Sequence, residues 1–219
     1  MGPGVDPLAR RLSFSHNGAV ARSFEVAFAW AFASWLLCAC TSGPTRASDH
    51  VFHPDASCPV TIDEPALLPA VHVNLNSDVQ WNSNPPSSGS HYAVWAAFQA
   101  YSFPVSRLYY VHDLEHGAIV FLYRCGDAGC PDIVQGLQAA SDAIPDDDLC
   151  TANGQGVRVR TVITPDPLID VPVAAAAWGW TYKAECLDPP TLKQFALDHY
   201  RHGPEDLCTQ GDPNPLPAQ

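Results

Sequence analysis

The sequence predicts an α+β domain, mainly an antiparallel sheet with two or three helices, braced by disulfides. Short segments rich in β-branched and aromatic residues alternate with two amphipathic stretches, and most of these strand-like segments are joined by loops. Six cysteines follow residue 40, and an even number suits paired cross-links in an exported domain. With 219 residues, 47% of them apolar, the chain is long enough to bury one sizeable core.

The N-terminal segment indicates export. An apolar run at 26–37 follows three arginines, and its length suits the core of a signal peptide but is too short to span a bilayer. The run ends in Leu37-Cys38-Ala39-Cys40, which resembles a bacterial lipobox. We therefore expect residues 1–39 to be a signal peptide and Cys40 to carry a lipid. An N-terminal anchor helix that is never cleaved is the alternative.

Composition divides the mature chain into three parts. Residues 40–57 have no apolar period, which predicts a tether between the lipid and the domain. A single globular domain is expected over 58–208, and the proline-rich residues 209–219 are expected to form a disordered tail. The protein would then be exported and membrane-anchored through its lipid, in the periplasm or at the cell surface.

The six cysteines of the expected domain predict three disulfides. Fifteen pairings are possible, and the sequence does not choose among them. A thiolate zinc site is the alternative, because the short gap between Cys125 and Cys130 is compatible with zinc, but no second close pair completes four ligands. The six are Cys58, Cys125, Cys130, Cys150, Cys186 and Cys208.

Segments rich in β-branched and aromatic residues predict four strands, and apolar residues at helical spacing predict two helices. One helix begins at Pro131 and carries an apolar face as far as Ile144. The other follows Asp188, which is expected to cap it, and its apolar face extends to His199. The strands are expected at 108–111, 118–123, 157–163 and 177–182.

The charge balance makes nucleic acid an improbable partner. Lys and Arg number 11 against 23 Asp and Glu, which gives a net charge of −12. Such a surface repels phosphate backbones, so no nucleic-acid partner is expected. The sequence points to no particular protein partner.

The run His112-Asp113-Leu114-Glu115-His116-Gly117 is the strongest local signal for chemistry. It formally matches the inverted zincin motif, but strand-like residues follow at once and leave no room for the long helix of such a peptidase. On a straight strand the two histidines would lie about 13 Å apart, too far to share one ion. A single helical turn would bring the rings together, and Gly117 suits the left-handed conformation that ends such a turn. The alternative is one buried core histidine and one exposed histidine.

Four motifs occur in order along the chain: Asn84-Pro-Pro-Ser-Ser-Gly-Ser-His91-Tyr92, Val111-His-Asp-Leu-Glu-His-Gly117, Ala177-Trp-Gly179 and His202-Gly-Pro-Glu205. They resemble the signatures of a bacterial family of exported proteins called domain of unknown function 3105. The resemblance covers about residues 80–208 and implies no reaction. It does imply that His91, His112 and His116 belong together.

These residues predict a metal site. Three histidines from a rigid loop and a turn suit a zinc or copper ion with an open coordination position. We expect His91, His112 and His116 as ligands, with Glu115 or Asp113 orienting a ligand ring from behind. Because Met1 is the sole methionine, a thioether site for copper(I) is not expected.

Three classes of function follow from this pattern. The first is an envelope lipoprotein that holds or delivers copper or zinc. The second is a metal-free binding module, in which the 84–91 loop and nearby aromatic residues bind a peptide, a glycan or an envelope partner. The third is a zinc-dependent hydrolase. No nucleophile elbow, phosphate loop or dinucleotide fingerprint supports another class of enzyme.

Overall fold

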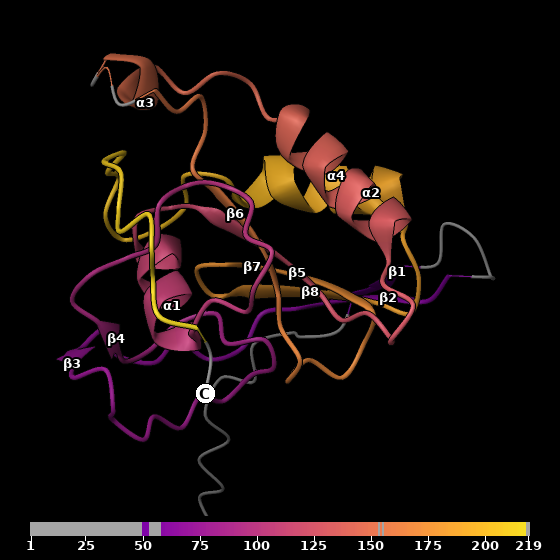
Figure 1. The fold of residues 1–219 in the computed structure, drawn as a ribbon, viewed down its shortest axis with the longest axis horizontal. Helices are drawn as coiled ribbons and strands as arrows, with labels where there is room; N and C mark the ends of the chain where they lie inside the picture. The colour runs from indigo at the N-terminus through magenta and orange to yellow at the C-terminus, as the bar shows by residue number, and fades with distance from the viewer. Residues whose placement is uncertain (1–49, 53–57, 153, 155, 218–219) are drawn as a thin grey trace, which may run out of the picture. The chain divides into compact units, whose positions relative to one another are not determined.

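The computed structural model describes residues 50–52, 58–152, 154 and 156–217. The expected signal peptide and Cys40 lie outside the described residues. Those that are described form a six-stranded sheet in the order β1-β2-β8-β7-β5-β6 and a separate two-stranded sheet of β3 and β4 (Figure 1). Among the same residues, none of the helices combines the length and the apolar character that a membrane span requires.

The large sheet is antiparallel except where β5 runs parallel to β6, so the prediction of a mainly antiparallel α+β fold is confirmed. β5 matches the strand predicted at 118–123, whereas β6 starts within the segment predicted at 157–163 and extends beyond it. The strands are β1 (His50–Phe52), β2 (Val60–Asp63), β5 (Ile119–Tyr123), β6 (Thr161–Pro165), β7 (Val173–Ala177) and β8 (Trp180–Ala184).

Helices cover both faces of this sheet. α2 and α4 occupy the two predicted stretches, and the Asp188 carboxylate caps α4 by accepting from the Thr191 backbone N–H. Figure 1 shows α2 and α4 side by side on one face, with α1 on the other. The helices are α1 (Arg107–Glu115), α2 (Pro131–Asp142), the short α3 (Asp148–Ala152) and α4 (Pro189–His199).

Strand β5 lies at the centre of the core because it is buried on both faces. Val120 and Leu122 pack in one apolar cluster with residues of α1. Ile119 and Phe121 point to the opposite face and pack in a second cluster with residues of α2 and α4. The first of these clusters supports the helix that carries the candidate site.

Residues 108–111 belong to α1, so the prediction of a strand there is wrong. Tyrosine and valine are common in half-buried strands, which is why the sequence predicts a strand here. In the structure every residue of α1 except Arg107 is buried. A helix buried on all sides has no polar face, so the period that would have identified it is absent.

A hairpin replaces the single strand predicted at 177–182. β7 and β8 are joined at Trp178 and Gly179, and the glycine has φ +77°, a conformation that side chains with a Cβ rarely adopt. The prediction missed β7 because four of its five residues are alanines, which have little preference for strands.

Backbone pairing reaches into both segments that flank the predicted domain. β1 lies within the predicted tether at 40–57 and pairs with β2. In the predicted tail, Asp212 accepts from the Ala97 N–H at 2.8 Å, and Leu216 accepts from Ser106 at 3.1 Å. Proline lacks a donor, but the carbonyls of a proline-rich segment still accept hydrogen bonds. Residues 209–217 are therefore part of the domain and do not form the predicted disordered tail.

The six cysteines of the domain form three disulfides, as predicted, which indicates an oxidising compartment. Cys58 pairs with Cys186 across a separation of 128 residues, Cys125 with Cys130 across five, and Cys150 with Cys208 across 58. No thiolate is left among them to bind a metal, so the alternative of a cysteine zinc site is not realised.

We expect the long disulfide to stabilise the fold more than the short one. Replacing Cys58 and Cys186 by alanine should lower the free energy of unfolding by roughly 5 kcal/mol, and replacing Cys125 and Cys130 by roughly 2 kcal/mol. The reason is that a disulfide that closes a longer loop removes more conformational entropy from the unfolded chain. Urea denaturation of both double variants measures this. Equal losses would contradict it.

Candidate metal centre

The end of α1 positions two of the candidate residues. His112 and Glu115 are three residues apart in the helix and therefore lie on the same side of it. Gly117 follows with φ +79°, as the sequence predicted for the residue that ends the turn. A Cβ atom at this position would approach the Arg201 Cα to 2.9 Å, so the close packing of these two chain segments requires glycine.

A parallel pairing between β3 (His72–Val73) and β4 (His91–Tyr92) positions the other two. His72 lies directly opposite His91 in the register, and the His91 N–H donates to the Val71 carbonyl at 3.0 Å. The proline-rich loop before β4 is buried over residues 85–89, which fixes the strand that carries His91.

His72, His91, His112 and Glu115 converge, and we call these four residues the metal group. Each offers one ligand atom, and these atoms all lie within 4.8 Å of one another. The Glu115 Oε2 atom is 3.0 Å from His91 Nε2 and 3.8 Å from His112 Nε2. The group can therefore hold a metal ion. His72 is its exposed member, and the other three residues are buried.

Backbone carbonyls orient two of the rings. His91 Nδ1 lies 2.8 Å from the Gly89 carbonyl oxygen, and His112 Nδ1 lies 2.7 Å from that of Tyr92. Because a carbonyl oxygen only accepts, each Nδ1 carries the proton and donates it. In the neutral ring each Nε2 then keeps a lone pair that is free to bind a metal.

Burial keeps these rings neutral. Desolvation lowers the pKa of His112 to about 3 and also lowers the pKa of His91. His91 Nε2 has no hydrogen bond even though the Glu115 carboxylate lies 3.0 Å away. In a neutral ring held by Gly89, that atom presents a lone pair to the carboxylate. Two acceptors at this distance repel each other, and a cation relieves the repulsion by binding both.

The other predicted residues lie beside the metal group. The His116 ring centroid is 4.6 Å from that of His112, but His116 is not one of the four converging residues. Asp113, expected behind a ligand ring, instead accepts from the Ala96 N–H at 3.2 Å, and burial raises its pKa well above the usual range. Glu115, also expected behind a ring, is itself a member of the group.

His72 is the residue that the sequence analysis missed. It stands between two valines in Val71-His72-Val73. This strand-like pattern is too short to indicate which other strand it pairs with. Nothing local to this segment shows that it pairs with residues 91–92. The remaining histidine on an apolar helix face, His199, stacks on Trp180 with ring centroids 4.5 Å apart, and burial lowers its pKa to about 4, as suits a core residue.

The fully buried Arg160 guanidinium supports the end of α1. Its Nη1 donates to the His116 carbonyl at 2.6 Å. Its Nη2 lies 2.6 Å from Asp147 Oδ2 and 2.7 Å from Asp206 Oδ1. Burial raises the pKa of Asp147, but hydrogen bonds from Tyr200 and Arg160 outweigh it and lower that pKa. The pair is therefore ionised, and the charge inside the domain is compensated.

We expect Arg160→Met to destabilise the domain by about 3–5 kcal/mol, because it removes the buried cationic partner of the Asp147 carboxylate and leaves the half-exposed Arg201 guanidinium at 3.6 Å. Arg124→Met is the matched control, since Arg124 is exposed, and it should change the free energy of unfolding by less than about 0.5 kcal/mol. Denaturant titration of both variants measures the difference. Similar small losses in both would show that Arg160 is dispensable.

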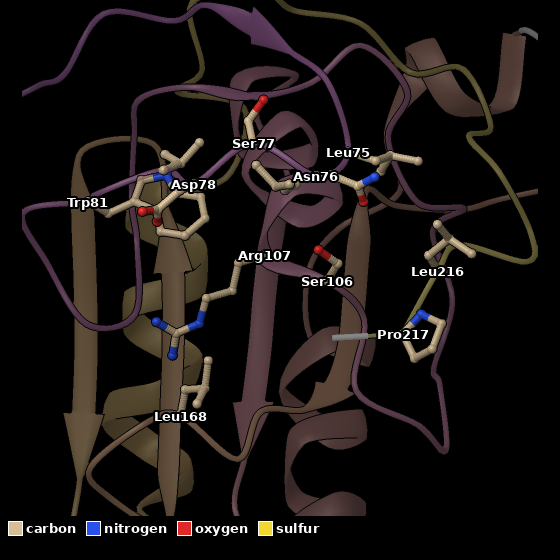
Figure 2. A pocket seen from close by; sticks show the side chains of 12 residues that line it. Leu75, Asn76, Ser77, Asp78, Trp81, Ser106, Arg107, Leu168, Leu216 and Pro217 are labelled. Carbon is tan, nitrogen blue, oxygen red and sulfur yellow. The ribbon is translucent and has the colours of Figure 1, made fainter. Parts of the chain in front are cut away.

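A cavity of about 280 Å³ lies at the opposite end of α1 from the metal group. It is lined by Ser106 and Arg107 at the start of the helix, and by apolar side chains that include Leu168 and Leu216 (Figure 2). The Arg107 guanidinium is already engaged, because it donates to Asp166 at 2.9 Å and to Asn84 at 2.8 Å. None of the four residues of the metal group lines this cavity, so it is separate from the candidate metal centre.

A family model described as a protein of unknown function, DUF3105, matches residues 72–211. The match covers more than half of the chain and includes the whole metal group. No curated protein and no solved structure matches the chain.

Proposed function

The chain belongs to the DUF3105 family, and we propose that it is an exported protein that holds or delivers a zinc or copper(II) ion. The observation that carries the proposal is the convergence of three imidazoles and a carboxylate, with ligand atoms within 4.8 Å of one another. Histidine nitrogens and carboxylate oxygens are both zinc ligands, and zinc commonly takes four ligands in all.

The electrostatics of the metal group support a cation as its occupant. Buried polar atoms normally have partners, and a buried His91 Nε2 without a hydrogen bond facing a carboxylate calls for an explanation. Because burial lowers the pKa of both His91 and His112, these two rings need not lose a proton when they bind a metal at neutral pH. Backbone carbonyls already hold two of the rings in position, which reduces the entropy lost on binding.

The donor atoms favour zinc or copper(II) over copper(I). Copper(I) prefers thiolates and thioethers, but the six cysteines of the domain are paired in disulfides and the metal group contains neither sulfur ligand. Imidazole nitrogens suit both zinc and copper. The exposed His72 gives an ion access from solvent, as holding or delivery requires.

We expect loss of a group member to abolish tight metal binding without unfolding the domain. After treatment with a chelator, the parent should bind zinc, and binding should raise its melting temperature, because the ion binds only the folded state. His72→Ala and His112→Ala should each weaken the first zinc equivalent by at least about 10–100-fold, the range for residues that merely orient ligands. Isothermal titration calorimetry measures the affinities.

His202→Ala is the matched control, because His202 is exposed and lies outside the metal group. It should bind zinc as the parent does. If His72→Ala and His112→Ala also bind as the parent does, the histidines are structural. A metal-free binding module would then replace this proposal.

We also propose that a lipid on Cys40 anchors the mature protein in the envelope. The support is the lipobox-like Leu37-Cys38-Ala39-Cys40 behind an apolar run, together with disulfides that require an oxidising compartment. Mass spectrometry of the membrane fraction should find a mature N-terminus at Cys40 that carries acyl chains. Cys40→Ala should abolish the modification, whereas Cys38→Ala should retain it. An intact N-terminus in the parent would rule the anchor out.

A further inference from the structure

His116 is a buried imidazole that the metal group does not use. Its side chain is 1% exposed, and neither ring nitrogen has a hydrogen-bond partner among the described residues. Leaving such groups unpaired costs free energy, so an orphaned imidazole indicates a missing partner such as an ion. Its Nε2 lies 3.3 Å from Glu205 Oε2, at a geometry that makes no hydrogen bond.

The chain holds Glu205 at this place through its backbone. The Glu205 N–H donates to the Glu115 carbonyl at 3.0 Å, so the residue is attached to the last turn of α1. Gly203 packs so closely on the Glu115 carbonyl that no side chain fits there. The Glu205 side chain is 56% exposed, and its carboxylate therefore offers one oxygen to His116 while it remains accessible to solvent.

This pair lies next to the metal group. The ring centroids of His112 and His116 are 4.6 Å apart, and the Trp95 ring packs nearly perpendicular to His116 with ring centroids 4.4 Å apart. Resting on the function proposed above, we propose that His116 and Glu205 hold a second divalent cation, zinc or copper(II), beside the ion in the metal group.

The two positions differ in the number of protein ligands. The metal group supplies four, the number that a closed zinc site needs, and this suits retention of an ion. His116 and Glu205 supply two and leave the other coordination positions to water or to a ligand from another molecule. The outer position therefore binds more weakly, fills second and suits an ion that is arriving or leaving.

Zinc stoichiometry tests the proposal. At the zinc concentration that just fills both positions, the purified parent should hold two ions per chain by elemental analysis. At the same concentration Glu205→Gln should hold about one, because the amide lacks the charge of the carboxylate and weakens the second position at least about 10-fold. Because the Glu205 side chain is exposed, this substitution should not unfold the domain. Glu185→Gln, at an exposed glutamate after β8, removes the same charge and should retain both ions.

Copper(II) provides a second measurement. Two neighbouring copper(II) ions broaden each other's electron paramagnetic resonance signal, so the loaded parent should show a coupled spectrum and Glu205→Gln the spectrum of an isolated ion. Two ions with no coupling would mean that the second binds elsewhere, and would overturn the proposal.

Other outcomes separate this proposal from the one on which it rests. A single ion that His72→Ala removes and Glu205→Gln retains would overturn the second position and leave the proposed function standing. A single ion with the opposite response would support the outer position and overturn the metal group. No ion at all would overturn both.

Discussion

A single buried guanidinium holds together the parts of the chain on which the candidate site depends. Arg160 immediately precedes β6. Its guanidinium donates to the carbonyl of His116, the residue after α1, and forms ion pairs with Asp147 and Asp206. A buried charge is tolerated only when its donors are satisfied, and here the acceptors come from three distant segments. The arrangement therefore couples the end of α1 to the segment that carries Glu205. Both candidate ion positions lie at this junction.

Three of the four sequence motifs contact one another or α1 in the folded domain. The proline-rich loop leads into His91, and its Ser87 carbonyl accepts from the Gly179 N–H of the β7–β8 turn at 2.8 Å. The Gly-Pro-Glu segment is attached to α1 through the Glu205 N–H. Three segments that look unrelated in the sequence thus share a structural role, because each fixes the backbone around the metal group.

The chemistry of the site follows from what surrounds it. Burial keeps the His91 and His112 rings neutral, and backbone carbonyls accept hydrogen bonds from their Nδ1 atoms. The disulfides remove the six cysteines of the domain from competition for the metal. What remains is a set of nitrogen and oxygen donors around one point. Such a set suits zinc or copper(II). The buried His116 lies beside it and connects it to the exposed Glu205 carboxylate, 3.3 Å away.

The sequence by itself determined the class of fold, the family and the two amphipathic helices, because these depend on local periodicity, composition and spacing. It singled out the His112 to Gly117 run, two of whose residues belong to the metal group. It also placed a left-handed glycine at the end of the turn. The tertiary structure alone decided that α1 is a helix, since complete burial removed the amphipathic period. It alone decided the disulfide pairing and brought His72 opposite His91, because each joins residues whose separation leaves no mark on the local sequence. The tertiary structure also decided that His116 lies beside the metal group and faces Glu205, a residue far along the chain.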